Sequence, residues 1–201
     1  MMRLRQPASR ADELAALRRR LRTERAKASA DDERALTADV ARAKRAVAAA
    51  TGDVASCGSC AAHQPWPAGA FAGGACCSGN TADLFDDHEL AALAGAGTRP
   101  RDLRPPPGRD AHAGCAFRGA HACSLALDHR PARCVHYLCE TLRGELHRRG
   151  RLDDLETRLA DLDRAMRAFT AVHRARQDRE VLAPVIDAVR SAARRARRPP
   201  R

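Results

Sequence analysis

The sequence predicts a mainly α-helical protein. Long N- and C-terminal helices, paired antiparallel, flank an irregular, metal-stapled cysteine-rich module with one or two short helices. Three observations predict this. Leucines recur at helical spacing near both ends of the 201-residue chain. All eight cysteines lie between Cys57 and Cys139. The same stretch holds few large apolar side chains, so it needs a metal or disulfides to hold its fold.

Residues 1–52 are predicted to form an N-terminal helical arm. Ser9 followed by Asp12 is typical of a helix start, because a serine hydroxyl can accept a hydrogen bond from a backbone N–H of the first turn. A break or a second start is expected across 29–33, and Gly52 is expected to end the arm. Apolar residues recur with helical period on both sides of the break, at Leu14, Leu17, Leu21, Leu36, Val40, Ala43 and Val47.

Residues 143–201 are predicted to form a C-terminal helical arm with a basic tail. Its clearest pattern is a heptad seam, in which apolar residues alternate in steps of three and four, at Leu152, Leu155, Leu159, Leu162, Met166 and Phe169. We expect residues 9–50 to cover this seam within one chain, since Leu14, Leu17 and Leu21 have a similar spacing, with a homodimer through the arms as the alternative. Pro184 suits the first turn of a further helix, with Val185, Ile186 and Val189 on one face.

The cysteine-cluster module is assigned to residues 53–142. Asp86 and Glu89 indicate the start of a short helix that ends at Gly95 or Gly97. Residues 98–113 are rich in proline and are expected to form an exposed loop. After Arg130-Pro131, a helix is expected over 132–143, with Cys134, Tyr137 and Leu138 facing inward. The arginine could pair with thiolate charge or cap a helix.

Clustered thiols favour a metal site. Thiolate and imidazole are the side chains that soft metal ions bind best, and the two residues between Cys57 and Cys60 let both sulfurs face one ion. The candidate ligands are Cys57, Cys60, Cys76, Cys77, Cys115, Cys123, Cys134 and Cys139. They could close two four-coordinate zinc sites, or hold one iron–sulfur cluster and leave four over. The expected cofactor is therefore zinc or iron.

Six of the eight histidines lie in the same region. His63 and His136 follow cysteines closely and are possible ligands, although for each a surface or hydrogen-bonded position is the simpler expectation. His88 and His112 are expected to face solvent. His121 and His129 flank Cys123, and their roles stay open.

The order of these residues resembles the YkgJ-type cysteine-cluster family. The matching elements are Cys57-x2-Cys60, Cys76-Cys77, Cys115-Ala116-Phe117, Cys123 and Arg130-Pro131-x2-Cys134-x2-Tyr137-x-Cys139. The resemblance covers about residues 55–142 and implies a zinc- or iron-chelating domain with little indication of a reaction. The fifteen residues between Cys60 and Cys76 are more than the family's usual spacing.

The remaining function classes have weaker support. The chain has a net charge of +11, carried by the two arms, but acidic residues are interleaved with the basic ones and aromatic residues for base stacking are nearly absent there, which disfavours nucleic acid. No catalytic triad order, nucleotide-binding glycine loop or HExxH motif is present, so an iron-dependent enzyme remains an alternative without a named catalytic residue. Without a secretory signal or a long apolar run, we expect a cytoplasmic protein that does not enter the membrane.

Overall fold

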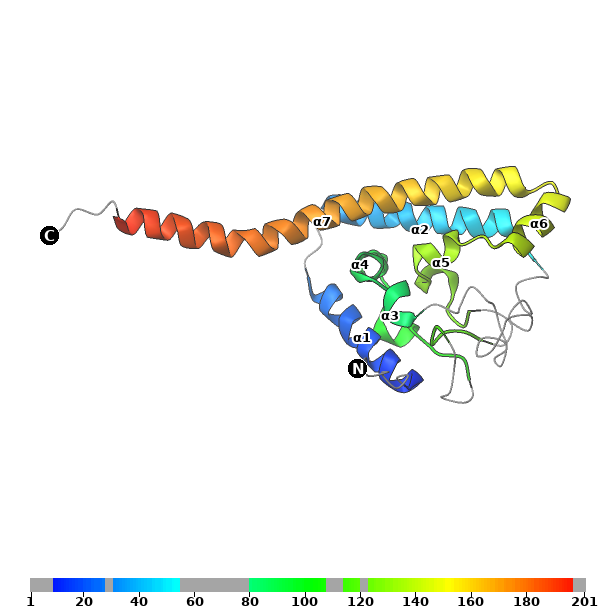
Figure 1. Ribbon diagram of the computed structural model, residues 1–201, viewed down its shortest axis with the longest axis horizontal. Coiled ribbons are helices and arrows are strands. Elements are labelled where there is room, and N and C mark those ends of the chain that lie inside the picture. The colour runs from blue at the N-terminus through cyan, green and yellow to red at the C-terminus, as the bar shows by residue number, and fades with distance from the viewer. Residues whose placement is uncertain (1–8, 28–30, 55–79, 108–113, 120–122, 197–201) are drawn as a thin grey trace, which may run out of the picture.

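The computed structural model describes residues 9–27, 31–54, 80–107, 114–119 and 123–196, and it is built of helices around a small irregular region (Figure 1). The prediction of a mainly helical chain with a long C-terminal helix is confirmed. Within the described residues, pairing of extended backbone is limited to an isolated bridge between Arg118 and Cys123. The helices are α1 (Arg10–Ala26), α2 (Asp31–Thr51), α3 (Thr81–Leu84), α4 (Asp87–Gly95), α5 (Ala132–His136), α6 (Glu140–Arg148) and α7 (Leu152–Ala196), with short 3-10 helices η5 (Pro100–Asp102) and η6 (Leu127–His129).

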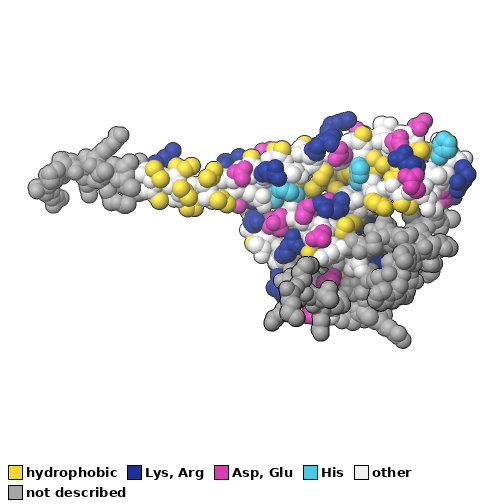
Figure 2. Space-filling view, in the orientation of Figure 1, with side chains coloured by type: hydrophobic (Ala, Val, Ile, Leu, Met, Phe, Trp, Pro, Cys, Tyr) yellow, Lys and Arg dark blue, Asp and Glu magenta, His cyan; other side chains and the backbone are white. Residues whose placement is uncertain are grey.

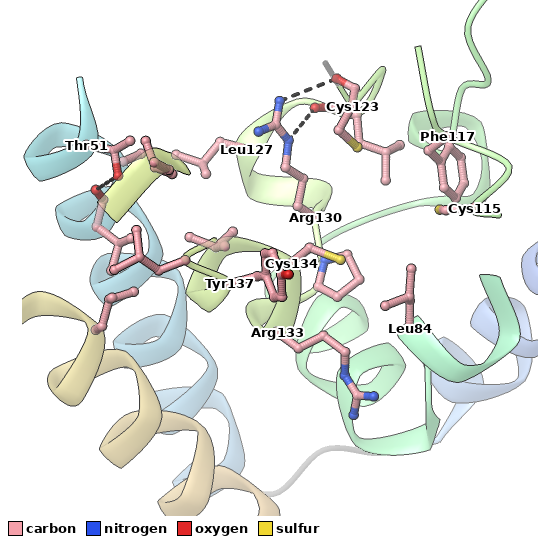
Figure 3. A pocket seen from close by; sticks show the side chains of 18 of the residues that line it. Thr51, Leu84, Cys115, Phe117, Cys123, Leu127, Arg130, Arg133, Cys134 and Tyr137 are labelled. Atoms are coloured by element: carbon pink, nitrogen blue, oxygen red, sulfur yellow. Dashed lines mark hydrogen bonds between the residues drawn. The ribbon is translucent and has the colours of Figure 1, made fainter. Parts of the chain in front are cut away.

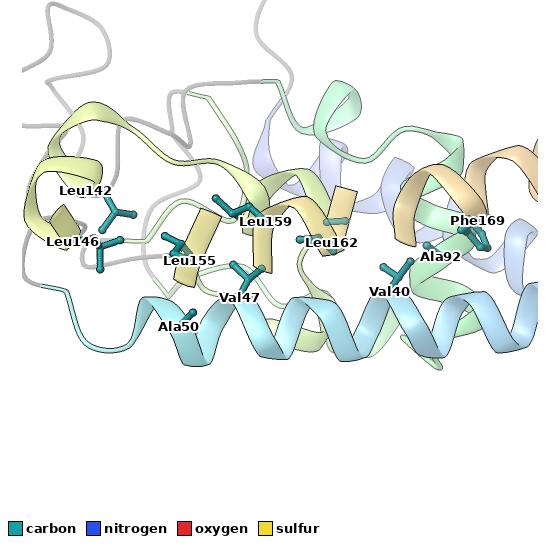
Figure 4. Packing of buried hydrophobic residues seen from close by; sticks show 12 residues of the cluster. Val40, Val47, Ala50, Ala92, Leu142, Leu146, Leu155, Leu159, Leu162 and Phe169 are labelled. Atoms are coloured by element: carbon teal, nitrogen blue, oxygen red, sulfur yellow. The ribbon is translucent and has the colours of Figure 1, made fainter. Parts of the chain in front are cut away.

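The long helix α7 packs along α2 (Figure 1). Arg176 donates to the Glu33 carboxylate at 2.7 Å, and Arg151 donates to the Ala49 carbonyl at 3.0 Å, so the start of α2 lies beside the middle of α7. Between these contacts the two helices bury apolar side chains against each other and against α4, α5 and α6 (Figure 4). We call this the helix-pair core: Val40, Val47, Ala50, Ala91, Ala92, Ala132, Leu142, Leu146, Leu155, Leu159, Leu162 and Phe169.

The first helix packs elsewhere. Leu14, Leu17 and Leu21 lie in a second cluster, and within the expected partner region, residues 9–50, it is α2 that packs on the seam of α7. We call the second cluster the cysteine-side core: Leu14, Leu17, Leu21, Phe85, Leu90, Leu93, Leu103, Cys115, Ala116, Phe117 and Leu125. The apolar face of α1 therefore packs on the loop segments that carry Cys115 and Leu125.

Local signals place the helix ends as expected. The Ser9 hydroxyl accepts a hydrogen bond from Asp12 N at 3.2 Å, and the Asp86 carboxylate accepts one from Glu89 N at 2.9 Å. Gly52 follows α2 with a φ of +57°, a left-handed conformation that favours glycine. Gly95 allows close packing of α4 on α2, since a Cβ there would lie 2.6 Å from Thr37 Cγ2.

Three local predictions need correction. Leu103, in the predicted exposed loop, is completely buried, while residues 108–113 lie outside the described residues. The helix expected over 132–143 is divided into α5 and α6, and Tyr137 between them is 57% exposed. Pro184 lies inside α7 and starts no new helix. A proline ring clashes with the carbonyl four residues earlier, which bends a helix, and at this position Glu180 is exposed to solvent, so the backbone has room to adjust.

Beyond α2, the last part of α7 projects from the body and carries hydrophobic side chains on its surface (Figures 1 and 2). Among the described residues, no helix is both long enough and apolar enough to cross a membrane.

Candidate functional site

A cavity of about 470 Å³ lies between the ends of α2 and α7 on one side and the irregular region on the other. Most of its lining is apolar, with Val47 and Leu155 on the helical side and Phe117 on the other. Three thiols line it as well, those of Cys115, Cys123 and Cys134, and they come from three separate segments of the chain (Figure 3). It is the one feature in the described part of the chain where cysteines distant in sequence share a space.

Cys115 is held in place by hydrogen bonds from the cysteine-side core. The Thr81 hydroxyl accepts a hydrogen bond from Ala116 N at 2.9 Å and donates one to the Glu13 carboxylate of α1 at 2.5 Å, so α1 and α3 together fix the loop that carries Cys115. Burial raises the pKa of the Cys115 thiol from 9.0 to about 11, against smaller opposing effects of hydrogen bonds from Phe117 and Thr81. At neutral pH this thiol is therefore protonated in the metal-free protein.

Arg130 holds the loop that carries Cys123. Its Nε donates to the Leu125 carbonyl at 2.9 Å and its Nη2 to the Cys123 carbonyl at 3.4 Å (Figure 3). Of the two roles that the sequence left open for this arginine, neither describes these bonds, which go to backbone oxygens of the preceding loop. The guanidinium thereby fixes the loop beside the cavity.

A buried carboxylate places Cys134. Glu89 on α4 accepts hydrogen bonds from the backbone N–H groups of Ala132 and Arg133, at 2.7 and 2.9 Å, which are the first amides of α5. Burial raises the pKa of Glu89, while these hydrogen bonds and the Arg133 guanidinium oppose the increase. Two first-turn amides otherwise without helical partners are thus satisfied, and α5 is fixed on α4 with Cys134 at the cavity.

Lys44 is a functional-site neighbour that the sequence reasoning missed. Its ammonium donates to the Asp128 carbonyl at 3.0 Å, and burial lowers its pKa from 10.5 to about 8. Glu89, Asp128 and Cys134 lie close enough to oppose that decrease. The sequence did contain a signal for the burial of Lys44. Lys44 follows Val40 by four residues, so both side chains lie on the same side of the helix, which faces inward.

Cys139 is used differently from the three cavity thiols. It precedes α6, and its sulfur accepts a hydrogen bond from Leu142 N at 3.4 Å, as a serine hydroxyl would at a helix start. It is partly buried against the helix-pair core. The structure thus brings Cys115, Cys123 and Cys134 to one cavity and leaves Cys139 at its helix end, while Cys57, Cys60, Cys76 and Cys77 lie outside the described residues.

One of the described histidines, His88, differs from expectation. His88 was predicted to face solvent, but its Nδ1 lies 2.8 Å from Nδ1 of the fully buried His173. His129 Nδ1 lies 3.0 Å from the Thr98 hydroxyl, and His136 is exposed on α5. His63, His112 and His121 fall outside the described residues.

Within the described ranges, no three cysteine, histidine or acidic side chains lie close enough together to hold a metal ion. No disulfide joins the four described cysteines to one another. Comparison with protein families, with curated proteins and with solved structures finds no significant match to this chain.

Proposed function

We propose that this chain is a metal-binding cysteine-cluster protein that holds zinc or iron through thiolates at the cavity between α2 and the irregular region. The observation that carries the proposal is that Cys115, Cys123 and Cys134, from three segments, line one cavity. The order of the cysteines, which resembles the YkgJ-type family, supports the same proposal.

The geometry at the ends of residues 55–79 adds support. Val54, the last described residue before this segment, lines the cavity, as does Leu84 shortly after it. Val54 and Leu84 therefore both lie at the cavity, and the sequence between them contains Cys57, Cys60, Cys76 and Cys77. In the proposed centre these thiols complete the ligand set that the described cysteines begin, since zinc and iron–sulfur sites each need four ligands.

Protonation makes the proposal testable through pH. Metal ligation requires the thiolate, and the pKa of Cys115 is about 11 without a metal. Binding must therefore release a proton from this residue, and the apparent affinity must rise with pH through the neutral range. At a site of unburied thiols this rise would end above about pH 8.5, the ordinary thiol pKa, whereas for Cys115 it continues to about pH 11.

The test is metal analysis of full-length protein purified without oxygen. We expect one or more equivalents of zinc or iron per chain by elemental analysis. Colour with acid-labile sulfide would assign an iron–sulfur cluster, and a colourless zinc protein would assign a thiolate zinc centre. Cys115→Ser and Cys134→Ser should each lower the bound metal, whereas Ser124→Ala, beside Cys123 in the same loop, should not.

Cys139→Ser separates two roles for that residue. Serine is a good helix-start residue. If the Cys139 sulfur only accepts the hydrogen bond at the start of α6, the Cys139→Ser variant should therefore bind as much metal as the wild type. A loss of metal equal to that of Cys115→Ser would make Cys139 a ligand. The proposal is overturned if wild-type protein, purified anaerobically or reconstituted with zinc or ferrous iron, retains no stoichiometric metal.

A further inference from the structure

The projecting part of α7 carries an apolar stripe that the described residues leave exposed. We call it the tail stripe: Val181, Leu182, Val185, Ile186 and Val189. These side chains are 45% to 71% exposed, the largest exposed fractions among the large aliphatic residues of the described chain. The stripe is visible on the projecting helix in Figure 2.

The tail stripe lies on a different side of the helix from the residues that meet α2. At about 100° per residue, Val185 and Val189 fall nearly opposite Leu162 and Phe169 around the helix axis. A longer α2 would therefore not reach them. The heptad phase changes after His173, so one continuous helix presents two apolar faces directed to two partners.

We propose that the tail stripe pairs with the same stripe of a second copy of this chain, with the two helices antiparallel. When two copies cross level with Pro184, Leu182 lies opposite Ile186 of the second copy, and the two Val185 side chains lie near the two-fold axis. The contact is self-complementary, as a two-fold interface requires.

Charge and area both fit a second copy. In this register Asp178, at one end of the stripe, lies level with Arg190 of the second copy, and the symmetry makes the pair twice. From the exposed fractions, the five side chains offer about 500 Å² per copy, or about 1,000 Å² in total, which is the lower limit for a specific interface. We therefore expect a weak dimer whose population depends on protein concentration.

A lipid surface fits the same stripe less well. Helices that lie in a membrane interface carry aromatic residues or leucines on the apolar face and basic residues along the polar face. Here four of the five stripe residues are β-branched, Asp178 lies in line with them, and Glu180 and Asp187 are acidic neighbours on the polar side.

Sedimentation equilibrium of the full-length protein, from micromolar to millimolar concentration, tests the pairing. We expect a monomer–dimer equilibrium, and Val185→Glu should weaken it at least about tenfold by placing a charge in an apolar contact. Ala183→Glu introduces the same charge on the other side of the tail and should leave the dissociation constant within about twofold. A wild-type protein that stays monomeric throughout overturns the proposal.

A charge exchange tests the antiparallel register. Asp178→Arg should weaken association about threefold, and the double change Asp178→Arg with Arg190→Asp should restore it, because the pair is re-formed with reversed sign. Failure of the double variant to recover rejects this register. Binding of a monomeric wild type to phosphatidylserine vesicles, abolished by Val185→Glu, rejects the dimer in favour of a lipid surface. Both readouts are independent of metal content.

Discussion

The two cores of this protein are built in different ways. The helix-pair core joins two long helices through a repeating seam, so each buried residue is supported by neighbours one turn away on the same helix. The cysteine-side core joins α1, α4, Phe85, Leu103 and the two loop segments that carry Cys115 and Cys123, and it has no repeat. A repeated seam can stand on apolar packing alone. The second core depends on contacts made across many chain segments, and two cysteine residues are part of it or pack against it.

The largest expected effect is that of metal removal, which under the proposed function breaks only one of the two cores. Structural metal sites in small domains contribute on the order of 10 kcal/mol to folding. We expect a chelator to accelerate amide hydrogen exchange across residues 114–119 and 123–130 and to leave α2 and the packed half of α7 protected. Equal loss of protection in both cores would contradict their independence.

A cavity in the helix-pair core has the next largest effect. Leu162 is buried between α2 and α7, and Leu162→Ala should lower the free energy of unfolding by about 3 kcal/mol through lost burial and an unfilled space. Arg164→Ala, exposed two residues away, should change it by less than about 0.5 kcal/mol. Urea denaturation measures both, and equal midpoints for the two variants would show that the seam carries little of the stability.

Loss of the carboxylate that links the two cores should cost somewhat less. Glu89→Ala leaves two buried amides of α5 without an acceptor, which should destabilise the fold by about 2 kcal/mol. Glu89→Gln keeps one acceptor oxygen and should recover part of the loss. Glu156→Ala, which removes an exposed ion pair with Arg143, is the matched control. If Glu89→Ala costs no more than this control, α5 is fixed by other contacts.

The smallest expected effect is a pH dependence at the contact between α4 and α7. Burial lowers the pKa of His173, as do Arg176 and His88 beside it, while Glu33 of α2 and Glu24 of α1 oppose the decrease. The folded state therefore keeps this imidazole neutral where the unfolded chain binds a proton. The contribution of His173 to the free energy of unfolding is complete above about pH 6.5, the pKa of an ordinary histidine. It is lost as the pH falls from that value through the lowered pKa of the folded state.

The measurement is the urea midpoint from about pH 7 to about pH 5. His173→Gln should have a flatter pH dependence than wild type, whatever its absolute stability. His147→Gln, at an exposed position on α6, should keep the wild-type slope. Parallel curves for all three proteins would show that protonation of His173 does not contribute.

Sequence periodicity predicted which side chains are buried better than what buries them. The seam from Leu155 to Phe169 and the helix starts at Ser9 and Asp86 follow from spacing and from short-range hydrogen bonds. Periodicity placed the partner of the seam within residues 9–50 but did not distinguish α1 from α2, because the stripe at Leu14 has the same spacing as the stripe of α2. A periodic pattern of apolar residues identifies which side of a helix is buried. It does not identify the helix that covers this side when two helices carry apolar residues at the same spacing.

Part of the candidate site was predictable and part was not. The cysteines were identified by type, and three of them line one cavity. The use of Cys139 at a helix start and the contact of His88 with His173 depend on where α6 and α7 lie, which no local spacing encodes. Lys44 differs from these residues, because its position in the helical period indicated that its side chain is buried. Its burial was not predicted because lysine side chains usually face solvent.

The unbroken course of α7 through Pro184 gives the molecule a built-in spacer. At a rise of about 1.5 Å per residue, the eight residues from Arg176, which still contacts Glu33 of α2, to Pro184 span about 12 Å. In the paired form, two thiol-lined cavities are carried on a single rod, with about 24 Å of helix between the Arg176 contacts of the two bodies. Such an assembly is bivalent, so any surface or macromolecule with repeated sites at a matching separation is bound with an avidity that one copy does not have.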